Sequence, residues 1–384
     1  MKKILWLASW YPSREEPFAG DFIQRHARAV AAFCQVQVIC VVKNKNKQAG
    51  QEQKETVSGN LAEALIYYNA PGTGIGLLDK FLSHRKYIRL YQRAIREYIN
   101  KNGKPDSIHV HVAMKAGLLA LWVKKNWNIP FVVTEHWTGY YRQSVPSLYD
   151  KNRWFRQMNI KVLRQASRLV PVTKHLGDTI RQHFADITFT AIPNVVNTEL
   201  FFYKTPAPAV FRFIHVSGMN YQKNPEGILK ACSLLGNSGY AFELFMLGNK
   251  EPGLMQIAED TGLLNKTVFF EDMVPYAVVA KQMQQSNALL LFSRFENQPC
   301  VVLESLCCGL PVISTKVGGI GELIDESNGI LIENGDVNGL VSAMQQLMDD
   351  YSKYDRASIA AKASAAFNYQ VVGKRIAEVY DFIS

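Results

Sequence analysis

Two glutamates, Glu296 and Glu304, stand in a segment whose residues predict a strand, a loop and a short helix. Residues 288–292 are apolar and form a run short enough for a buried parallel strand. Pro299 suits the first turn of a helix, and Gly309 suits its end. Since a carboxylate accepts hydrogen bonds from two neighbouring hydroxyl groups, we expect the two glutamates to bind separate parts of one long ligand.

The same segment offers a place for phosphate. A loop that leaves the carboxyl end of a parallel strand lies where open α/β sheets bind their ligands. The first turn of the following helix adds unpaired N–H groups and a partial positive charge. The alternative is that both glutamates are solvated surface residues, but the second apolar strand expected at 312–315 favours a binding site.

Length and composition favour two domains in a cytoplasmic protein. The chain has 384 residues, of which 48% are hydrophobic, enough for two cores. No run of about 18 apolar residues is present, so we expect no membrane-spanning segment. The six cysteines show no metal-ligand spacing and suggest reduced thiols. The apolar run at 3–9 is expected to be the first strand and not a signal peptide.

The charge is divided unevenly along the chain. Residues 1–200 hold 29 Lys and Arg against 14 Asp and Glu, a net charge of +15. Residues 201–384 hold 14 Lys and Arg against 19 Asp and Glu, a net charge of −5, so that the whole chain has a net charge of +10. No helix-turn-helix, zinc finger or RNA-binding signature accompanies the basic half, so nucleic acid is not expected as a partner.

Sequence motifs around the two glutamates resemble a known family. The spacing Glu-x7-Glu is followed by Leu-Cys-Cys-Gly-Leu-Pro-Val-Ile-Ser-Thr at 306–315 and Val-Gly-Gly-Ile-Gly-Glu at 317–322. This pattern resembles the donor site of retaining glycosyltransferases of family four. The resemblance implies an α/β protein with the GT-B fold, two Rossmann-like domains that face each other across a cleft.

The resemblance also implies roles for individual residues. Glu296 would bind hydroxyl groups of the transferred sugar, and Glu304 would bind the ribose of the nucleotide. The loop that holds the sugar and the diphosphate would consist of Asn297, Gln298, Pro299, Cys300 and Val301. Here Asn297 to Cys300 replace the Gly-Phe-Gly of many members.

Other positions match the family outside this segment. Gly20 resembles the glycine of the first loop, which faces the donor phosphates, and His136 resembles the histidine that contacts the transferred sugar. Lys223 matches a lysine that stabilises the leaving diphosphate. Gly218 replaces the usual arginine, and Val195 replaces a usual glycine. The implied catalytic residues are His136, Glu296 and Lys223.

The expected domains follow from these motifs. Residues 1–196 would form a Rossmann-like domain on the acceptor side, and residues 197–367 a Rossmann-like domain that binds the nucleotide-sugar. Residues 368–384 would form a helix that crosses back to the first domain. The segments expected to be irregular include a polar stretch at 43–58 and a linker at 204–208.

The basic segment 79–101 is expected to be an amphipathic helix. Its apolar residues keep the spacing of one helix face, while arginines and lysines fall largely elsewhere. One interpretation is a surface helix that packs on its own domain. The other is contact with an anionic membrane or an anionic lipid carrier.

The sequence thus predicts a retaining hexosyltransferase that moves a sugar from a nucleotide-diphosphate-sugar to an acceptor hydroxyl in polysaccharide or glycolipid synthesis. The acceptor would be a glycan or a lipid-linked sugar, and the protein would lie in the cytoplasm, with peripheral contact at the inner membrane face. No Asp-x-Asp sequence occurs, so no metal and no cofactor is expected. The alternatives are a nucleotide-sugar epimerase and a catalytically silent nucleotide-sugar-binding protein of the same fold.

Overall fold

The computed structural model describes residues 1–46, 50–205 and 209–383, which divide into two compact units. Unit 1 contains Met1–Trp137, Leu148–Val195 and the C-terminal segment from Tyr369. Unit 2 contains Thr138–Ser147 and Val196–Asn368. The short segment Thr138–Ser147 therefore belongs to unit 2, although the sequence analysis placed it in the first domain. The last three residues of the expected linker lie outside the described residues.

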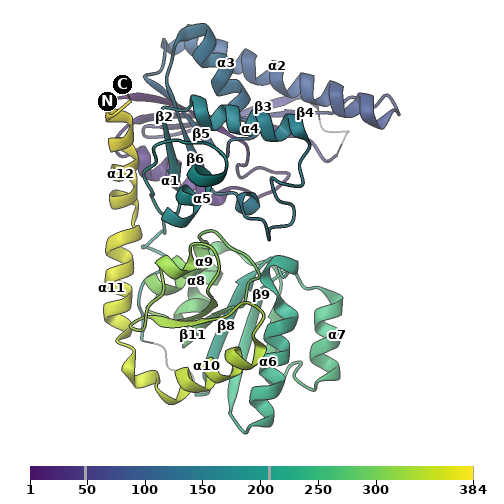
Figure 1. The fold of residues 1–384 in the computed structure, drawn as a ribbon, viewed down its shortest axis with the longest axis vertical. Coiled ribbons are helices and arrows are strands. Elements are labelled where there is room, and N and C mark those ends of the chain that lie inside the picture. Colours follow the sequence, from purple (N-terminus) through teal and green to yellow (C-terminus); the bar gives the residue numbers. More distant parts are fainter. Residues whose placement is uncertain (47–49, 206–208, 384) are drawn as a thin grey trace. The chain divides into compact units, whose positions relative to one another are not determined.

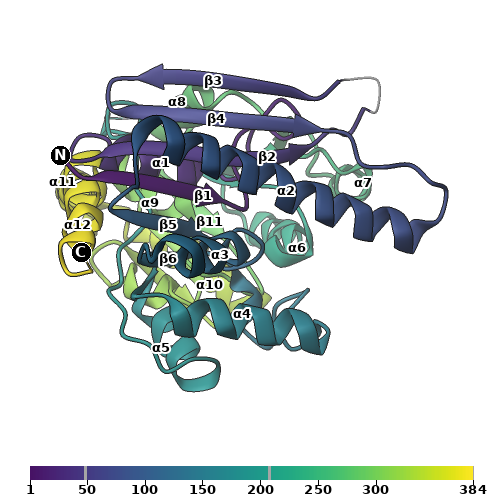
Figure 2. The ribbon, with the colours of Figure 1, turned by 90° about the horizontal axis from the view of Figure 1, so that it is seen from above.

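Unit 1 is a layered α/β structure on a seven-stranded sheet with the order β3-β4-β2-β1-β5-β6-β7. All neighbouring strands are parallel except β3 and β4, which are antiparallel. Figure 2 shows β3 and β4 at one edge of this sheet, with α2 running alongside the strands. Its elements are β1 (Lys3–Ala8), α1 (Asp21–Val30), β2 (Gln35–Lys43), β3 (Glu52–Ser58), β4 (Leu61–Tyr68), α2 (Gly76–Asn102), β5 (Ser107–His111), α3 (Gly117–Trp127), β6 (Phe131–Glu135), α4 (Arg153–Gln165), β7 (Arg168–Pro171), α5 (Lys174–His183) and α12 (Tyr369–Asp381).

Unit 2 is built on a six-stranded sheet, entirely parallel, with the order β10-β9-β8-β11-β12-β13. Figure 1 shows helices such as α6 and α10 beside its strands. Its helices and strands are β8 (Phe211–Ser217), α6 (Pro225–Asn237), β9 (Phe242–Gly248), α7 (Pro252–Asp260), β10 (Val268–Glu271), α8 (Tyr276–Gln284), β11 (Ala288–Leu291), α9 (Cys300–Cys307), β12 (Val312–Thr315), β13 (Gly329–Ile332), α10 (Val337–Asp349) and α11 (Arg356–Phe367). Short 3-10 turns are η1 (Thr138–Tyr140), η2 (Tyr221–Lys223), η3 (Ile320–Glu322) and η4 (Tyr351–Lys353).

The parallel strands are buried apolar runs, as the sequence predicts. All four residues of β11 and all four of β12 are buried, because helices cover both faces of such sheets. Each unit has its own cores, one centred on Trp6 and Val38 in unit 1 and one centred on Leu289 and Leu303 in unit 2. The prediction of two parallel-sheet α/β domains is confirmed.

The expectation of an irregular polar stretch at 43–58 is wrong for its second half. Glu52–Ser58 forms β3, which pairs antiparallel with β4 and is exposed along its whole length. No apolar alternation marks this strand, because it covers no core and its side chains face water. Charged residues such as Lys54 and Glu55 protect this sheet edge from pairing with another chain.

The expected amphipathic helix is α2, but its first turns are not packed on the sheet. Tyr91, Ala94 and Ile95 are buried, whereas Leu77 and Phe81 are 82% and 55% exposed. Figures 1 and 2 both show the first turns of α2 extending beyond the strands of unit 1. The apolar residues at the start of the helix therefore have no core to cover them.

The C-terminal helix α12 packs directly on α1 through a glycine. A Cβ atom added at Gly373 would lie 2.2 Å from the carbonyl oxygen of Ala29, so only glycine permits this approach. The surrounding contact is made by buried apolar side chains that include Val372 and Ile376 of α12 and Val30 of α1.

We expect Gly373→Ala to destabilise unit 1 by about 1–3 kcal/mol, because the added methyl group forces the two helix backbones apart. Gly236→Ala is the matched control, since this helical glycine is exposed and no atom lies within 4 Å of an added Cβ. The control should be neutral or stabilise by up to about 1 kcal/mol. Chemical unfolding of both variants measures the difference, and equal stabilities would contradict the proposed close packing.

Candidate functional site

The site residues that the sequence predicts in unit 2 lie where the strand order of its sheet reverses. The chain builds β8, β9 and β10 towards one edge and then returns to place β11 on the other side of β8. At such a switch point the loops after the two central strands separate and leave a crevice at the carboxyl ends. The loop after β8 leads to Lys223, and the loop after β11 contains Glu296.

The β11–α9 segment has the local structure that its sequence predicts. Pro299 caps the start of α9, and Gly309 follows the helix with a φ angle of +72°. The N–H of Gly309 donates to the carbonyl of Leu306 at 2.9 Å, and the N–H of Leu310 donates to that of Ser305 at 2.9 Å. This pair of bonds is a Schellman motif, which requires the left-handed backbone that glycine supplies.

Glu296 and Lys223 form a partly buried ion pair. The Lys223 ammonium donates to the Glu296 carboxylate, and the side chains are 18% and 5% exposed, respectively. The backbone of Glu296 is fixed as well, because a Cβ at Gly318 would lie 1.8 Å from its carbonyl oxygen. An ammonium group has three donors, so Lys223 can hold Glu296 and still donate to a ligand.

Glu304 lies inside α9 and is 2% exposed. The hydroxyl of Tyr276, the first residue of α8, donates a hydrogen bond to its carboxylate. The Tyr276 ring is itself held edge-on against Phe201, with the ring centroids 4.8 Å apart. A carboxylate at such a depth needs hydrogen-bond donors, and the Tyr276 hydroxyl is one of them.

The residues between the two glutamates are mostly buried. Asn297 is 3% and Gln298 8% exposed, and the Tyr141 hydroxyl donates to Asn297 Oδ1 at 3.3 Å. Tyr141 belongs to the short Thr138–Ser147 segment of unit 2. Cys300 and Val301 are half-buried at the start of α9, so the sequence-predicted loop and helix start are brought together in one place.

The loop that leads to Lys223 is anchored by a buried histidine. His215 of β8 faces the Leu290 carbonyl with Nδ1 at 2.9 Å and Ser217 Oγ with Nε2 at 2.7 Å. Ser217 Oγ then accepts from the N–H of Met219 at 3.0 Å. Burial lowers the pKa of His215 to about 4, so its ring is neutral at pH 7. Sequence analysis missed this residue, because an isolated histidine in a strand gives no signal.

Gly218 leaves open space at the position where the resemblance implies an arginine. The nearest atom to an added Cβ is the side-chain nitrogen of Asn220, 3.9 Å away. Its φ angle is outside the left-handed region, so other residues fit the backbone. The position can therefore accept a side chain without a clash at Cβ.

In unit 1, Gly20 is a glycine by necessity. Its φ angle is +70°, and an added Cβ would lie 2.7 Å from the carbonyl carbon and oxygen of Trp10. It stands at the N-cap of α1, directly after the loop that follows β1. This is the position at which a helix start can approach an anion closely.

His136 follows β6 and is positioned by its neighbour Glu135, which is fully buried. Glu135 Oε2 accepts from the N–H of His136 at 3.1 Å, and Oε1 accepts from the N–H of Ala113 at 2.8 Å. The ring of His136 packs against Phe22 of α1, with centroids 4.6 Å apart. Helix α1 therefore brings Gly20 and His136 into one region of unit 1.

Three histidines of unit 1 form a cluster that the sequence analysis did not identify. His26, His111 and His136 each place one ring nitrogen within 4.8 Å of the others. Burial, and then the neighbouring cationic or imidazole groups, lowers the pKa of His26 to about 3 and those of the other two well below the ordinary value.

Neutral imidazoles in such a group can ligate a transition metal. The cluster joins α1, β5 and the end of β6, so no spacing along the chain reveals it. The expectation that no metal is required stays a prediction.

Two family models match nearly the whole chain. The model described as Glycosyltransferase Family 4 matches residues 20–200, and the model described as Glycosyl transferases group 1 matches residues 199–364. Together they extend from the Gly20 loop into α11.

Several curated proteins are similar in sequence. The putative teichuronic acid biosynthesis glycosyltransferase TuaC of Bacillus subtilis is 23% identical over 373 residues, which cover 89% of this chain and 88% of that protein. The D-inositol 3-phosphate glycosyltransferase of Paenarthrobacter aurescens is 25% identical over 290 residues, 70% of this chain and 71% of that protein. The glycogen synthase of Mycobacterium tuberculosis is 24% identical over 293 residues, 73% and 70% of the two chains.

Solved structures are similar over the full length. Sucrose-phosphate synthase from Thermosynechococcus elongatus has a TM-score of 0.81 at 18% identity and 99% coverage of both chains. Anabaena HepE in complex with UDP has a TM-score of 0.74 at 16% identity and 100% coverage of both chains. These similarities confirm the predicted GT-B fold class.

We expect the stability of unit 2 to fall in acid through His215. The unfolded histidine binds a proton below about pH 6.5, whereas the folded one resists until about pH 4, so acid favours the unfolded chain. This group alone should remove about 2 kcal/mol of stability between pH 7 and pH 5.

His215→Gln should therefore lose less stability than the parent over this pH range. His183→Gln is the control, because His183 is an exposed histidine on α5, outside unit 2. Urea unfolding at pH 7 and pH 5 measures the difference, and an unchanged pH dependence in His215→Gln would contradict the assignment.

Proposed function

Since the chain belongs to glycosyltransferase family four, we propose that it transfers a hexose from a nucleotide-diphosphate-sugar to an acceptor hydroxyl with retention of the anomeric configuration. The observation that supports this proposal most directly is the ion pair of Lys223 and Glu296 at the switch point of unit 2, with Glu304 on the helix that follows. This arrangement offers a cation for a diphosphate and two carboxylates for separate sets of hydroxyl groups.

The proposed donor contacts divide between the two glutamates. Glu304 accepts hydrogen bonds from the ribose, and Glu296 accepts hydrogen bonds from the transferred sugar. The loop of Asn297, Gln298, Pro299, Cys300 and Val301 lies against the sugar and the diphosphate, with the N–H groups at the start of α9 directed to phosphate oxygens. Gly20 supplies a second close approach to the phosphates, and His136 orients the sugar, both by resemblance to the family.

Departure of the nucleoside diphosphate is the step that this site stabilises. As the bond from the anomeric carbon to the phosphate oxygen breaks, negative charge increases on the diphosphate. Lys223 and the start of α9 are fixed before reaction, so they stabilise that charge without reorganisation. The acceptor hydroxyl attacks from the same face and passes its proton to the departing phosphate, without a protein nucleophile, a metal or a cofactor.

The names of relatives guide the choice of substrates. Relatives are named for teichuronic acid biosynthesis, D-inositol 3-phosphate and glycogen, and neighbours were solved with UDP or UDP-glucose. We therefore propose a UDP-sugar as the first donor to test and a glycan or lipid-linked acceptor in cell-surface polysaccharide or glycolipid synthesis.

The proposed location is the cytoplasm, with peripheral contact at the inner membrane face. Within the described residues, no helix is both long and apolar enough to cross a bilayer. The start of α2 combines exposed Leu77 and Phe81 with nearby Lys80 and Arg85, a pattern that suits an anionic lipid surface.

A donor screen tests the proposed function. Thermal unfolding with UDP-, GDP- and ADP-sugars identifies the nucleotide, and release of nucleoside diphosphate without acceptor then measures turnover. Stabilisation by one nucleotide-sugar with slow hydrolysis supports the transferase. Stabilisation without any turnover, even with acceptors, would indicate a silent binding protein, and a change in the donor sugar itself would indicate an epimerase.

We expect Glu296→Ala and Glu304→Gln to have different effects. Glu296→Ala should reduce turnover about 10–150-fold with little change in affinity for the free nucleoside diphosphate, since the part of the donor that Glu296 contacts is the sugar. Glu304→Gln should weaken the nucleoside diphosphate and the donor together. Isothermal titration and steady-state kinetics separate the two effects, with the exposed Glu326→Gln as control. Identical losses in the two variants would contradict the assigned contacts.

Lys223→Ala should raise the reaction barrier by at least about 2–4 kcal/mol, because it removes the fixed cation beside the leaving diphosphate. Turnover should fall more than donor affinity, since the charge is greatest in the transition state. Lys230→Ala, an exposed lysine on α6, is the control. Gly218→Arg in the Lys223→Ala background should restore part of the rate. A Lys223→Ala enzyme with a rate within about threefold of the parent would contradict this mechanism.

A further inference from the structure

Unit 1 contains a pocket at the carboxyl ends of its strands. Its volume is about 1060 Å³, and it is lined at the strand ends by Ser9, Val41, Tyr68 and Met114, with side chains from the first turns of α2 on another side. Strand order also reverses here, because β2 and β4 lie on one side of β1 and β5 lies on the other. The position of this pocket, at the carboxyl ends of parallel strands, and its volume are typical of sites that bind small molecules.

The charge of this pocket is positive. Its lining contains Lys43, Lys45, Lys80 and Lys115 against Glu16 and Asp79, a balance of four positive to two negative groups. Within the described part of the chain, only Lys45 among these lysines forms an ion pair, with Glu16 at 3.2 Å. Asp79 instead accepts hydrogen bonds from the N–H and the hydroxyl of Thr73, each at 2.7 Å.

Aromatic rings line the same pocket. Tyr87 and His84 of α2 line the pocket with Trp10, which is 38% exposed. The Lys115 ammonium lies 5.8 Å from the centre of the Tyr87 ring. Rings offer apolar faces to the C–H groups of a sugar, while hydroxyl and ammonium groups bind its polar substituents.

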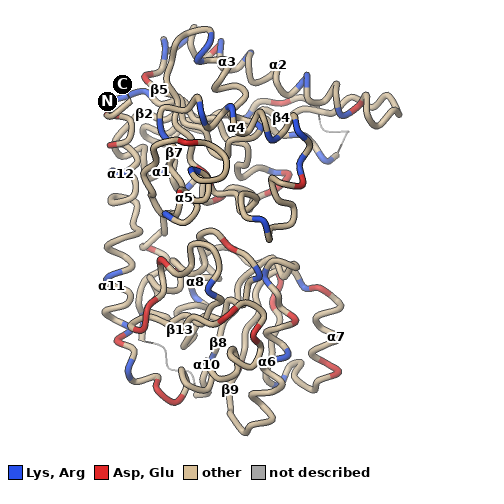
Figure 3. The backbone as a smooth tube through the Cα atoms, viewed as in Figure 1, with Lys and Arg blue, Asp and Glu red and all other residues tan. Residues whose placement is uncertain are grey.

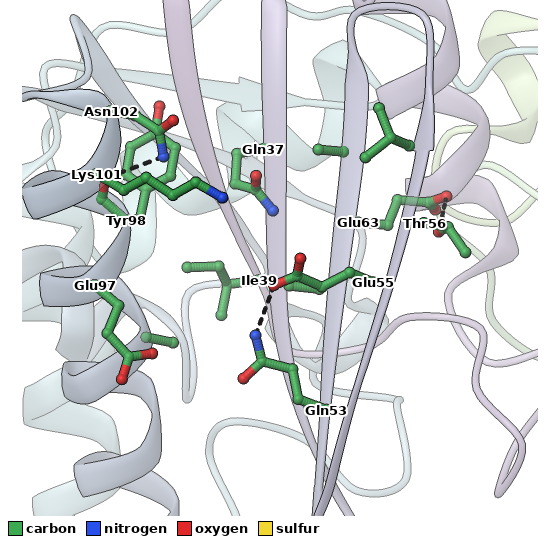
Figure 4. A pocket seen from close by; sticks show the side chains of 14 residues that line it. Gln37, Ile39, Gln53, Glu55, Thr56, Glu63, Glu97, Tyr98, Lys101 and Asn102 are labelled. Carbon is green, nitrogen blue, oxygen red and sulfur yellow. Dashed lines mark hydrogen bonds between the residues drawn. The ribbon is translucent and has the colours of Figure 1, made fainter.

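A second pocket of unit 1 has the opposite charge, so the basic lining is not general to this unit. Its volume is about 420 Å³. Figure 4 shows its lining side chains between α2 and the β3–β4 hairpin. Its lining includes Glu55, Glu63 and Glu97 against Lys101. Basic residues occur along α2 (Figure 3), yet of these two pockets the one at its N-terminal end is lined by several lysines and the other by one.

We propose that the basic pocket binds the acceptor and selects an acceptor sugar that carries an anionic substituent, a phosphate ester or a carboxylate. This inference rests on the proposed transferase function and adds the acceptor class. The sugar ring lies against the aromatic side chains. Its anionic group is bound by Lys80 and Lys115, with Lys43 nearby at the end of β2.

Binding of simple probes tests the inference without any donor. Saturation-transfer NMR and titration with D-glucose 6-phosphate, D-glucuronate and D-glucose compare a phosphate, a carboxylate and a neutral sugar of similar shape. We expect at least one anionic probe to bind about tenfold or more tightly than glucose. Preference between glucose 6-phosphate and glucuronate identifies the anionic group.

The variant Lys80→Gln with Lys115→Gln should reduce the affinity for the preferred anionic probe about tenfold and leave glucose binding unchanged. Both lysines are exposed, so the fold should be retained. Lys101→Gln is the matched control, an exposed lysine of the same helix that lines the acidic pocket. Equal binding of all three sugars, no binding of either anionic probe, or an equal loss in the control overturns the inference.

The donor assays are a separate measurement, so the two proposals can fail separately. Anion-selective binding that depends on Lys80 and Lys115, without turnover of any nucleotide-sugar, would refute the transferase and retain the pocket. Turnover with neutral acceptors, at rates unaffected by the two lysine replacements, would retain the transferase and refute the acceptor class.

Discussion

The direction of parallel strands is the constraint on which this structure depends. The carboxyl ends of all strands of the second sheet lie on one side of that sheet, and the same holds for all strands but β3 of the first sheet. The loops that follow the carboxyl ends take no part in the hydrogen bonds between strands, so polar side chains can gather there without loss of backbone hydrogen bonds. Where the strand order reverses, two such loops separate. Glu296 and Lys223 in unit 2, and the basic pocket in unit 1, lie at these points.

Buried charge then requires fixed partners. Glu135, Glu296 and Glu304 are each at most 5% exposed, and each accepts hydrogen bonds from groups that other elements position. A buried carboxylate without donors would cost several kcal/mol, so these partners are as necessary as the glutamates themselves. The same contacts make the sites rigid, which favours stabilisation of charge that develops during a reaction.

Buried histidines connect separate structural elements in both units. His215 joins β8, β11 and the loop that leads to Lys223 through its two ring nitrogens. In unit 1, His109 contacts Thr134 and Tyr380 at 2.6 Å each and so links β5, β6 and α12. Burial keeps these rings neutral at pH 7, because the charged form would lose its hydration. Such rings can both donate and accept, which suits them to buried connections.

The sequence by itself determined the elements whose signals are local. The apolar runs of β11 and β12, the proline before α9 and Gly309 after it lie within one short segment, so propensity and spacing predict that segment correctly. Glu296 and Glu304 are predicted for the same reason, because the family motif that contains them lies within this short segment.

Tertiary structure alone decided the contacts between distant residues. The partners Lys223 and Glu296 are 73 positions apart, and the histidine cluster joins three separate elements. β3 escaped prediction because it pairs at an edge and covers no core. The basic pocket draws its four lysines from three separate segments of the chain. Only the folded chain brings such residues together, because a parallel sheet places the carboxyl ends of strands that are remote in sequence side by side.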